Sequence, residues 1–303
     1  MPLIDRIEQS VRQLVLDELP YDHSDPALVS TLKSMSARDL LIRWFNWVHR
    51  LVPQAPRQVL QSEEFRANPF VWERQSDIQA LIADIEAGAD LTKYLSRGVE
   101  HGFVEPGKVK MHRQQDLDFM LSAWDIHHLH ISQKLEPDGY VERDALIVFA
   151  VFRSDKAYLI DLMTHNDWAR EHVIRVIVNN WPNDSLVHEF GGMSGGRKIG
   201  DEERLQLRKR QINTPIEIDG KLYGHPTVMT LAGVSSQAIL QADEVMDTLE
   251  DFAEEYERDP ATIIAQIGPD VAWPADPDFV VGFHPTAFGV YEVTTGTFIR
   301  LGP

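Results

Sequence analysis

The chain has 303 residues, enough for two domains and for a substantial hydrophobic core. It contains no cysteine, which excludes disulfides, thiolate metal sites and cysteine nucleophiles and leaves nitrogen and oxygen ligands for any metal. The formal net charge is -18, from 29 Lys and Arg against 47 Asp and Glu, and a field of that sign opposes nucleic-acid binding unless cations gather locally. Because no stretch approaches the roughly 20 apolar residues of a membrane span and the N-terminus does not resemble a signal peptide, we expect a cytoplasmic protein with no membrane partner.

The first third of the sequence predicts helices. Apolar residues recur every three or four positions over residues 3–19, which is the spacing of one helix face. Asp25-Pro26 offers an N-cap followed by a proline at the first helical position, and a segment that begins at Ser36 resembles a capping box before another helix. A glycine-rich stretch without clear periodicity ends this region. We therefore expect residues 1–112 to form a mostly α-helical region.

Residues 113–303 are expected to form an α+β domain on which the helical region packs. The wholly apolar run 145–152 is typical of a central strand covered on both faces, and a second strand is predicted at 157–163. The pair Asp219-Gly220 predicts a hairpin, and a long helix is expected from about residue 235 to 257. Short alternating runs near the C-terminus are expected to close the sheet.

The segment DIHHLHIS places three histidines within four consecutive positions. Side chains two apart on a strand share a face, so His128 and His130 are expected to point one way and His127 the other. The second strand ends close to His165 and Asp167, at a turn into a helix where backbone N–H groups can meet an anion. Because only one strand lies between the two segments, we expect His128 or His130 within a side chain's reach of His165.

Over residues 113–181, the succession of a strand ending in His, an apolar strand, a second strand ending in Thr-His and a helix resembles the core of the RelE-type toxin superfamily. The resemblance implies a small, mainly antiparallel sheet flanked by helices and a metal-free ribonuclease, of toxin or phage-defence type, with RNA and an antitoxin or other protein as partners. His130 and His165 would match the two histidines of that core. The loop between His130 and Ala145 is longer than in those toxins, which are also small and basic. The stretches HRLVPQAPRQV, GADLTKYLS and DIHHLHIS together resemble a family of bacterial proteins of uncharacterised activity, which implies no reaction.

RNA cleavage by the 2'-hydroxyl needs a base, an acid and a cation over the phosphorane. Histidines of opposite protonation can carry out the two proton transfers, and a guanidinium or ammonium group can neutralise the phosphate. The candidate catalytic residues are His128, His130, His165, Asp167 and Arg153. The candidate substrate-binding residues are Arg197 and Lys198, in a glycine-rich loop before a helix.

Two other functions are compatible with the same residues. In the first, His128, His130, His165 and Asp167 form a nitrogen and oxygen shell for Zn, Fe or Mn in a metal-dependent enzyme. In the second, the histidines bond backbone carbonyls in a tight turn, and the chain is a non-enzymatic interaction or sensor protein. The ribonuclease hypothesis requires no cofactor.

Overall fold

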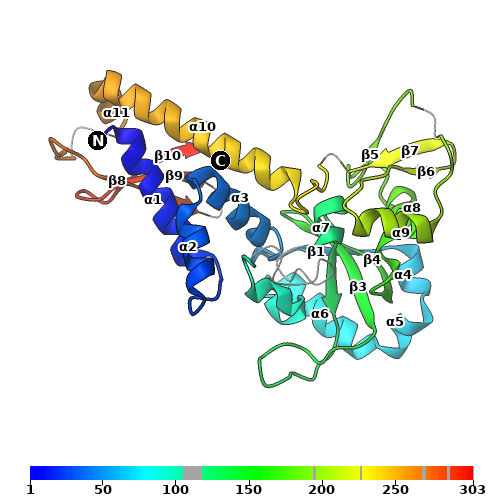
Figure 1. The fold of residues 1–303 in the computed structure, drawn as a ribbon. Coiled ribbons are helices and arrows are strands. Elements are labelled where there is room, and N and C mark those ends of the chain that lie inside the picture. The colour runs from blue at the N-terminus through cyan, green and yellow to red at the C-terminus, as the bar shows by residue number, and fades with distance from the viewer. Residues whose placement is uncertain (105–117, 194–195, 226, 268–270, 285–286, 303) are drawn as a thin grey trace. The chain divides into compact units, whose positions relative to one another are not determined.

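The structure is a computed structural model, and it describes all residues except 105–117, 194–195, 226, 268–270, 285–286 and 303 (Figure 1). Helices and sheets are both abundant, which confirms the α+β class. Contacts divide the chain into unit 1, Met1–Phe45 with Ala238–Pro303, and unit 2, Asn46–Gln237. The boundary expected after residue 112 lies outside the described residues. None of the described helices has the length and apolar character needed to cross a membrane.

Unit 1 contains helices from both ends of the chain and a three-stranded antiparallel sheet in the order β10-β9-β8. Its helices and strands are α1 (Leu3–Glu18), α2 (Pro26–Ser34), the first part of α3 (Ala37–Val48), most of α10 (Ser236–Arg258), α11 (Pro260–Ile267), β8 (Phe279–His284), β9 (Ala287–Glu292) and β10 (Thr297–Gly302). The predicted caps are confirmed: Asp25 accepts from the backbone N–H groups of Ala27 and Leu28, and Ser36 accepts from that of Asp39.

The C-terminal strands form a sheet of their own, so the expectation that they close the sheet of residues 145–152 is wrong. The buried stripe of α1, which includes Ile7 and Val11, packs beside β8. The hydroxyl of Ser10 accepts a hydrogen bond of 2.7 Å from the backbone N–H of Val281 in β8. The helix therefore covers the apolar side chains of these strands.

Unit 2 is built on a four-stranded sheet in the order β1-β4-β3-β2. Its strands are β1 (Gln58–Gln61), β2 (His127–His130), β3 (Leu146–Phe152) and β4 (Lys156–Thr164). β2, β3 and β4 are antiparallel neighbours, and β1 is parallel to β4. The sheet is therefore mainly antiparallel. The sequence did not predict β1, because only its pairing with β4, distant in the chain, distinguishes this four-residue run from a loop.

Helices cover both faces of this sheet (Figure 1). On one face lie α4 (Glu63–Ala67), α5 (Pro69–Glu73), α6 (Gln75–Ala87) and the short 3-10 helices η1 (Thr92–Tyr94) and η2 (Arg97–Glu100). On the other face lie α7 (Phe119–Trp124), the 3-10 turn η4 (Asp167–Ala169) and α8 (Glu171–Asn180). Val148, Phe149 and Ala150 of β3 are fully buried, which confirms the predicted central strand.

A second small sheet lies beside α8, in the order β5-β7-β6. It consists of β5 (His188–Glu189), β6 (Ile216–Ile218) and β7 (Lys221–Gly224), and α9 (Asp201–Lys209) precedes β6. The predicted hairpin is confirmed, because Asp219 and Gly220 join β6 to β7 with φ values of 52° and 81°. Two consecutive positive φ angles are the property of the hairpin turn that Asp-Gly favours.

Candidate functional site

Three histidine side chains meet on the α7 face of the main sheet. His128 and His130 pair with Phe149 and Ile147 of β3, so their side chains share the face of those two residues. The rings of His128 and His130 have centroids 5.8 Å and 5.2 Å from that of His165, which follows the end of β4. The predicted proximity is confirmed. As predicted, His127 lies on the other side of the strand, where its ring packs edge-on against Phe152.

The three imidazoles are arranged as a possible ligand set. One ring nitrogen from each of His128, His130 and His165 can be chosen so that the three atoms lie within 4.8 Å of one another. His165 is exposed, His128 is partly buried and His130 is only 2 % exposed. Among the described residues, neither ring nitrogen of His130 has a hydrogen-bond partner. Burying polar atoms without hydrogen bonds costs free energy, and among the described residues His127, on the other side of the strand, is a second buried imidazole of which both ring nitrogens lack such a partner.

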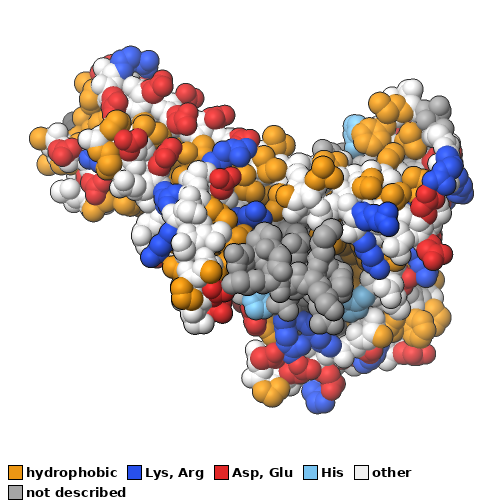
Figure 2. All heavy atoms as spheres, in the orientation of Figure 1, with side chains coloured by type: hydrophobic (Ala, Val, Ile, Leu, Met, Phe, Trp, Pro, Cys, Tyr) orange, Lys and Arg blue, Asp and Glu red, His pale blue; other side chains and the backbone are white. Residues whose placement is uncertain are grey.

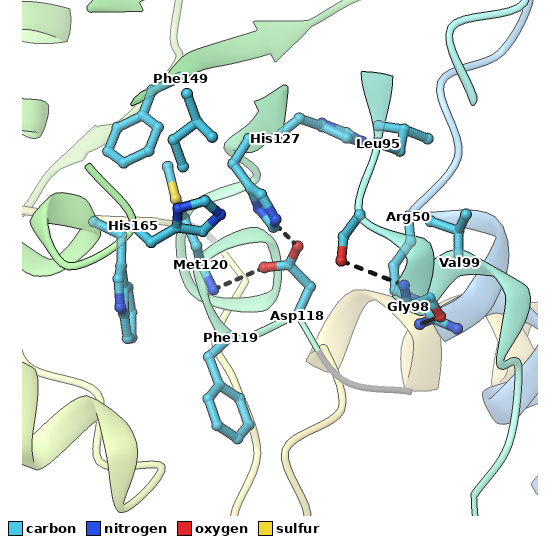
Figure 3. Close-up of a pocket in the computed structure, with 14 residues that line it drawn as sticks. Arg50, Leu95, Gly98, Val99, Asp118, Phe119, Met120, His127, Phe149 and His165 are labelled. Carbon is cyan, nitrogen blue, oxygen red and sulfur yellow. Dashed lines mark hydrogen bonds and ion pairs between the residues drawn. The ribbon is translucent and has the colours of Figure 1, made fainter. Parts of the chain in front are cut away.

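A carboxylate orients one of these rings. Oδ2 of Asp118 lies 3.3 Å from Nδ1 of His128. Oδ1 of the same residue accepts hydrogen bonds of 3.1 Å and 3.0 Å from the backbone N–H groups of Met120 and Leu121, in the first turn of α7. Figure 3 shows Asp118 between that first turn and the histidines. Asp118 therefore caps a helix and holds an imidazole at once.

The surroundings shift the pKa values of the histidines in opposite directions. Burial would lower the pKa of His128, but the charge and hydrogen bond of Asp118 raise it above the ordinary value. Burial lowers the pKa of His130 to about 3, and the nearby charges of His128 and Arg143 act in the same direction. Burial and the charge of His128 also lower the pKa of His165. His130 and His165 are thus neutral near pH 7, the form in which an imidazole nitrogen can bind a metal.

His128 in turn shifts the pKa of its partner Asp118. Burial by itself raises the pKa of this carboxyl group, but the charge and hydrogen bond of His128 and the backbone N–H of Leu121 lower it to about 2. The carboxylate is therefore ionised throughout the range in which an enzyme would work.

A cavity of about 380 Å³ opens beside the histidines, and His128 and His165 are among the residues that line it. Arg50 and Asp118 also contribute to the wall, and Arg50 donates hydrogen bonds of 2.7 Å and 2.6 Å to the backbone carbonyls of Gly98 and His101. Apolar side chains from several elements line much of the remaining wall: Leu95, Val99, Phe119, Met120, Phe149 and Trp168. The volume is within the range of small-molecule sites, roughly 300 to 1,000 Å³.

Asp167 lies in the turn after β4 but does not join the three histidines. Its Oδ2 accepts from the backbone N–H and the hydroxyl of Thr164, at 2.9 Å and 2.7 Å. Its Oδ1 is 2.8 Å from Nε of Arg170. The structure therefore places this carboxylate in the turn itself, with both oxygens engaged.

The candidate cations lie apart from the histidines. Arg153 follows the end of β3 opposite to His165 and pairs with Asp125 at 2.6 Å. Since β3 has 7 residues, roughly 20 Å of strand separates these ends. Arg197 pairs with Glu203, and Arg197 and Lys198 line a different pocket, of about 160 Å³.

Sequence reasoning missed two contributors to the site. Asp118 could have been found as an N-cap, because it directly precedes the apolar segment FMLSAW, but nothing in the sequence pairs it with His128. The backbone of Ala145 forms a hydrogen bond with His165. Such a main-chain partner is not encoded by a residue type, so no pattern in the sequence reveals it.

Comparisons of the chain with protein-family models, with curated proteins and with solved structures found no match. The residues and geometry of the site are therefore the basis for the function proposed below.

Proposed function

We propose that His128, His130 and His165 bind a transition-metal ion and that unit 2 is the catalytic domain of a metal-dependent enzyme. The observation that carries the proposal is the convergence of three imidazoles around His130, which is buried and lacks a hydrogen-bond partner among the described residues. A bound ion would use a nitrogen lone pair of His130 that has no partner in the described part of the chain. Three protein ligands with room for water or substrate are typical of catalytic rather than structural zinc sites.

The neighbours of the cluster support this proposal. Metal-binding histidines usually donate the second ring N–H to a carboxylate or a backbone carbonyl, which fixes the ring and its tautomer. Asp118 lies beside Nδ1 of His128, which leaves Nε2 of that ring for a metal. The backbone of Ala145 bonds His165. Two of the three candidate ligands therefore have the outer partners that such sites use.

The three ring nitrogens would have to move closer together to bind one ion. Zn–N bonds of about 2.0 to 2.1 Å in a tetrahedral site place the ligand nitrogens roughly 3.3 Å apart. The nitrogens of the cluster lie up to 4.8 Å apart, so the rings would approach by roughly 1.5 Å. The exposed side chain of His165 has the most freedom to make this change.

Three imidazole ligands suit Zn or Fe better than Mn, which prefers oxygen ligands. We expect Zn²⁺ or Fe²⁺, with Asp167 outside the ligand set, because both its oxygens are engaged in the turn. Such an ion supplies a Lewis acid and an activated water at neutral pH. His128, His130 and His165 hold the ion beside the cavity, and Asp118 keeps one of them in position.

The metal-free ribonuclease hypothesis remains a prediction with less support. It needs cations beside the histidines, and the three residues predicted for that role, Arg153, Arg197 and Lys198, lie elsewhere in unit 2. The charge of Arg143 does act on the three histidines, but this residue does not line the cavity beside them. On the face shown in Figure 2, Lys and Arg side chains lie among Asp and Glu side chains and do not form one broad basic surface. RNA binding draws most of its affinity from such a surface.

Metal binding by the purified full chain tests the proposal. We expect one Zn²⁺ or Fe²⁺ per chain by elemental analysis, and an increase of the melting temperature when Zn²⁺ is added to chelator-treated protein. His165→Ala should abolish both effects without unfolding the chain, because this side chain is exposed. His188→Ala removes an exposed histidine outside the cluster and should leave both unchanged.

The absence of cysteine simplifies the measurement, since no thiolate can bind the added metal. Equal metal content in the wild type and the His165→Ala variant would overturn the proposal. RNA cleavage that persists in chelator and is lost in His165→Ala would favour the metal-free hypothesis instead.

A further inference from the structure

The cavity beside the histidines has a chemical character that selects its ligand. It contacts the proposed metal centre through His128 and His165. Three aromatic side chains, Phe119, Phe149 and Trp168, line the same space, and they come from α7, β3 and η4. Figure 3 draws the residues of this wall, with Phe119, Phe149 and His165 labelled.

The wall offers few free charges to a ligand. Among the described residues that line the cavity, Arg50 is the only Lys or Arg, and its guanidinium donates to the carbonyls of Gly98 and His101. The carboxylate of Asp118 is held by His128 and by the first turn of α7. The described part of the wall would therefore offer a polyanion such as a nucleic acid chain little charge compensation, whereas an apolar group would replace water against its apolar side chains.

We infer that this cavity binds a small ligand in which an aromatic ring carries the oxygen atoms that reach the metal. The inference rests on the proposed metal centre and names the substrate class of that centre. Aromatic side chains from three elements can contact a ring edge-on or offset, which adds to the free energy gained by burying its area. The volume of about 380 Å³ accommodates a ring with its polar head and excludes a polymer as a whole.

Two hydroxamates serve as probes, because the head group binds metals and the attached group can be varied. Acetohydroxamate presents the head alone, and benzohydroxamate adds the ring. The full chain is loaded with Co²⁺, whose visible absorption reports both metal binding and ligand binding. We expect benzohydroxamate to bind about tenfold or more tightly than acetohydroxamate, since burying a ring of that size is worth at least one factor of ten. Titration of both probes with free Co²⁺ corrects for their intrinsic difference.

Substitutions in the cavity wall test which side chains cause the preference for benzohydroxamate over acetohydroxamate. Phe119→Ala and Trp168→Ala remove partly buried cavity walls and should reduce the preference severalfold, with acetohydroxamate affinity unchanged. Trp72→Ala removes an aromatic side chain that is 65 % exposed and does not line this cavity, so it should leave the preference intact. Cyclohexanecarbohydroxamate, which has apolar bulk without an aromatic face, should bind less tightly than benzohydroxamate.

The outcomes separate the two proposals. If Co²⁺ gives no histidine-dependent spectrum, the metal centre fails, and the ligand class fails with it. If Co²⁺ binds but the two probes have equal affinity, or the preference survives both wall variants, the centre stands and the aromatic ligand class is wrong. Equal binding of the cyclohexyl and phenyl probes would also overturn the aromatic assignment.

Discussion

Asp118 Oδ2 lies 3.3 Å from Nδ1 of His128, while Oδ1 of the same carboxylate accepts two backbone hydrogen bonds at the start of α7. One side chain thus links a candidate metal ligand to the first turn of a buried helix. Because α7 also contributes Phe119 and Met120 to the cavity wall, the position of Asp118 affects both the centre and the space beside it.

The first prediction concerns this link. Asp118→Ala should weaken Zn²⁺ binding by about 10- to 100-fold, as loss of an outer partner of a metal-binding histidine does. It should also destabilise the chain by about 1 kcal/mol through loss of the helix cap. Metal competition with a chromogenic chelator measures the first effect, and denaturant unfolding of the metal-free protein measures the second.

Asp118→Asn is the matched control, since the amide oxygen can still cap α7 while the negative charge beside His128 is lost. We expect near-normal stability of the metal-free protein and an intermediate metal affinity. Unchanged Zn²⁺ affinity in Asp118→Ala would show that the carboxylate does not support a metal ligand.

The second prediction concerns a histidine away from the cluster. His172 lies 3.1 Å from Asp161 through Nε2, and this hydrogen bond and charge raise its pKa above the ordinary value. A raised native pKa gives a stabilisation that is fully present below the unfolded value of about 6.5 and is lost as pH rises through the native pKa. The effect on stability should be small, because the side chain of His172 is 42 % exposed.

NMR titration of the His172 ring tests this assignment directly. Asp161→Asn keeps the hydrogen-bonding shape and should lower the pKa of His172 towards 6.5. Glu64 makes a weaker electrostatic contribution to the pKa of His172, so Glu64→Gln should lower this pKa less than Asp161→Asn does. A titration curve of His172 that does not move in Asp161→Asn would contradict the pairing.

The third prediction concerns the core of unit 2. Leu159 of β4 is fully buried, so Leu159→Ala should lower the free energy of unfolding by about 2 to 5 kcal/mol. Leu135 is 55 % exposed, so Leu135→Ala should change the free energy of unfolding by less than about 0.5 kcal/mol. Denaturant titration of both variants gives the comparison, and similar losses from the two would mean that β4 is not in the core.

The fourth prediction concerns the hairpin between β6 and β7. Gly220 has a φ of 81°, and no neighbouring atom would obstruct an added Cβ. Gly220→Ala should therefore destabilise the chain by about 1 to 2 kcal/mol through backbone strain alone. Gly191 has equal space and no positive φ, so Gly191→Ala should be close to neutral. Equal melting temperatures for the two variants would contradict the assigned turn.

Local patterns in the sequence predicted much of the fold. The helix caps at Asp25 and Ser36, the strand at β3 and the hairpin at Asp219-Gly220 follow from side chains that act within a few residues of one another. The two-residue period of a strand also separated His127 from His128 and His130. With one intervening strand, this period was enough to predict that His165 lies beside them.

Only the tertiary structure decided which groups join those histidines. Asp118 meets His128 because α7 packs on the sheet, and β1 becomes a strand because β4 offers it an edge. Arg153 follows the far end of β3, and Arg197 lines another pocket, although the sequence predicted both as residues of the histidine site. Packing of buried surfaces selects such distant pairings, and the free-energy cost of closing a loop grows only slowly with its length, so separation along the chain does not reveal them. The sequence therefore determined the faces on which the histidines lie, whereas packing determined their charged partners and the aromatic wall beside them.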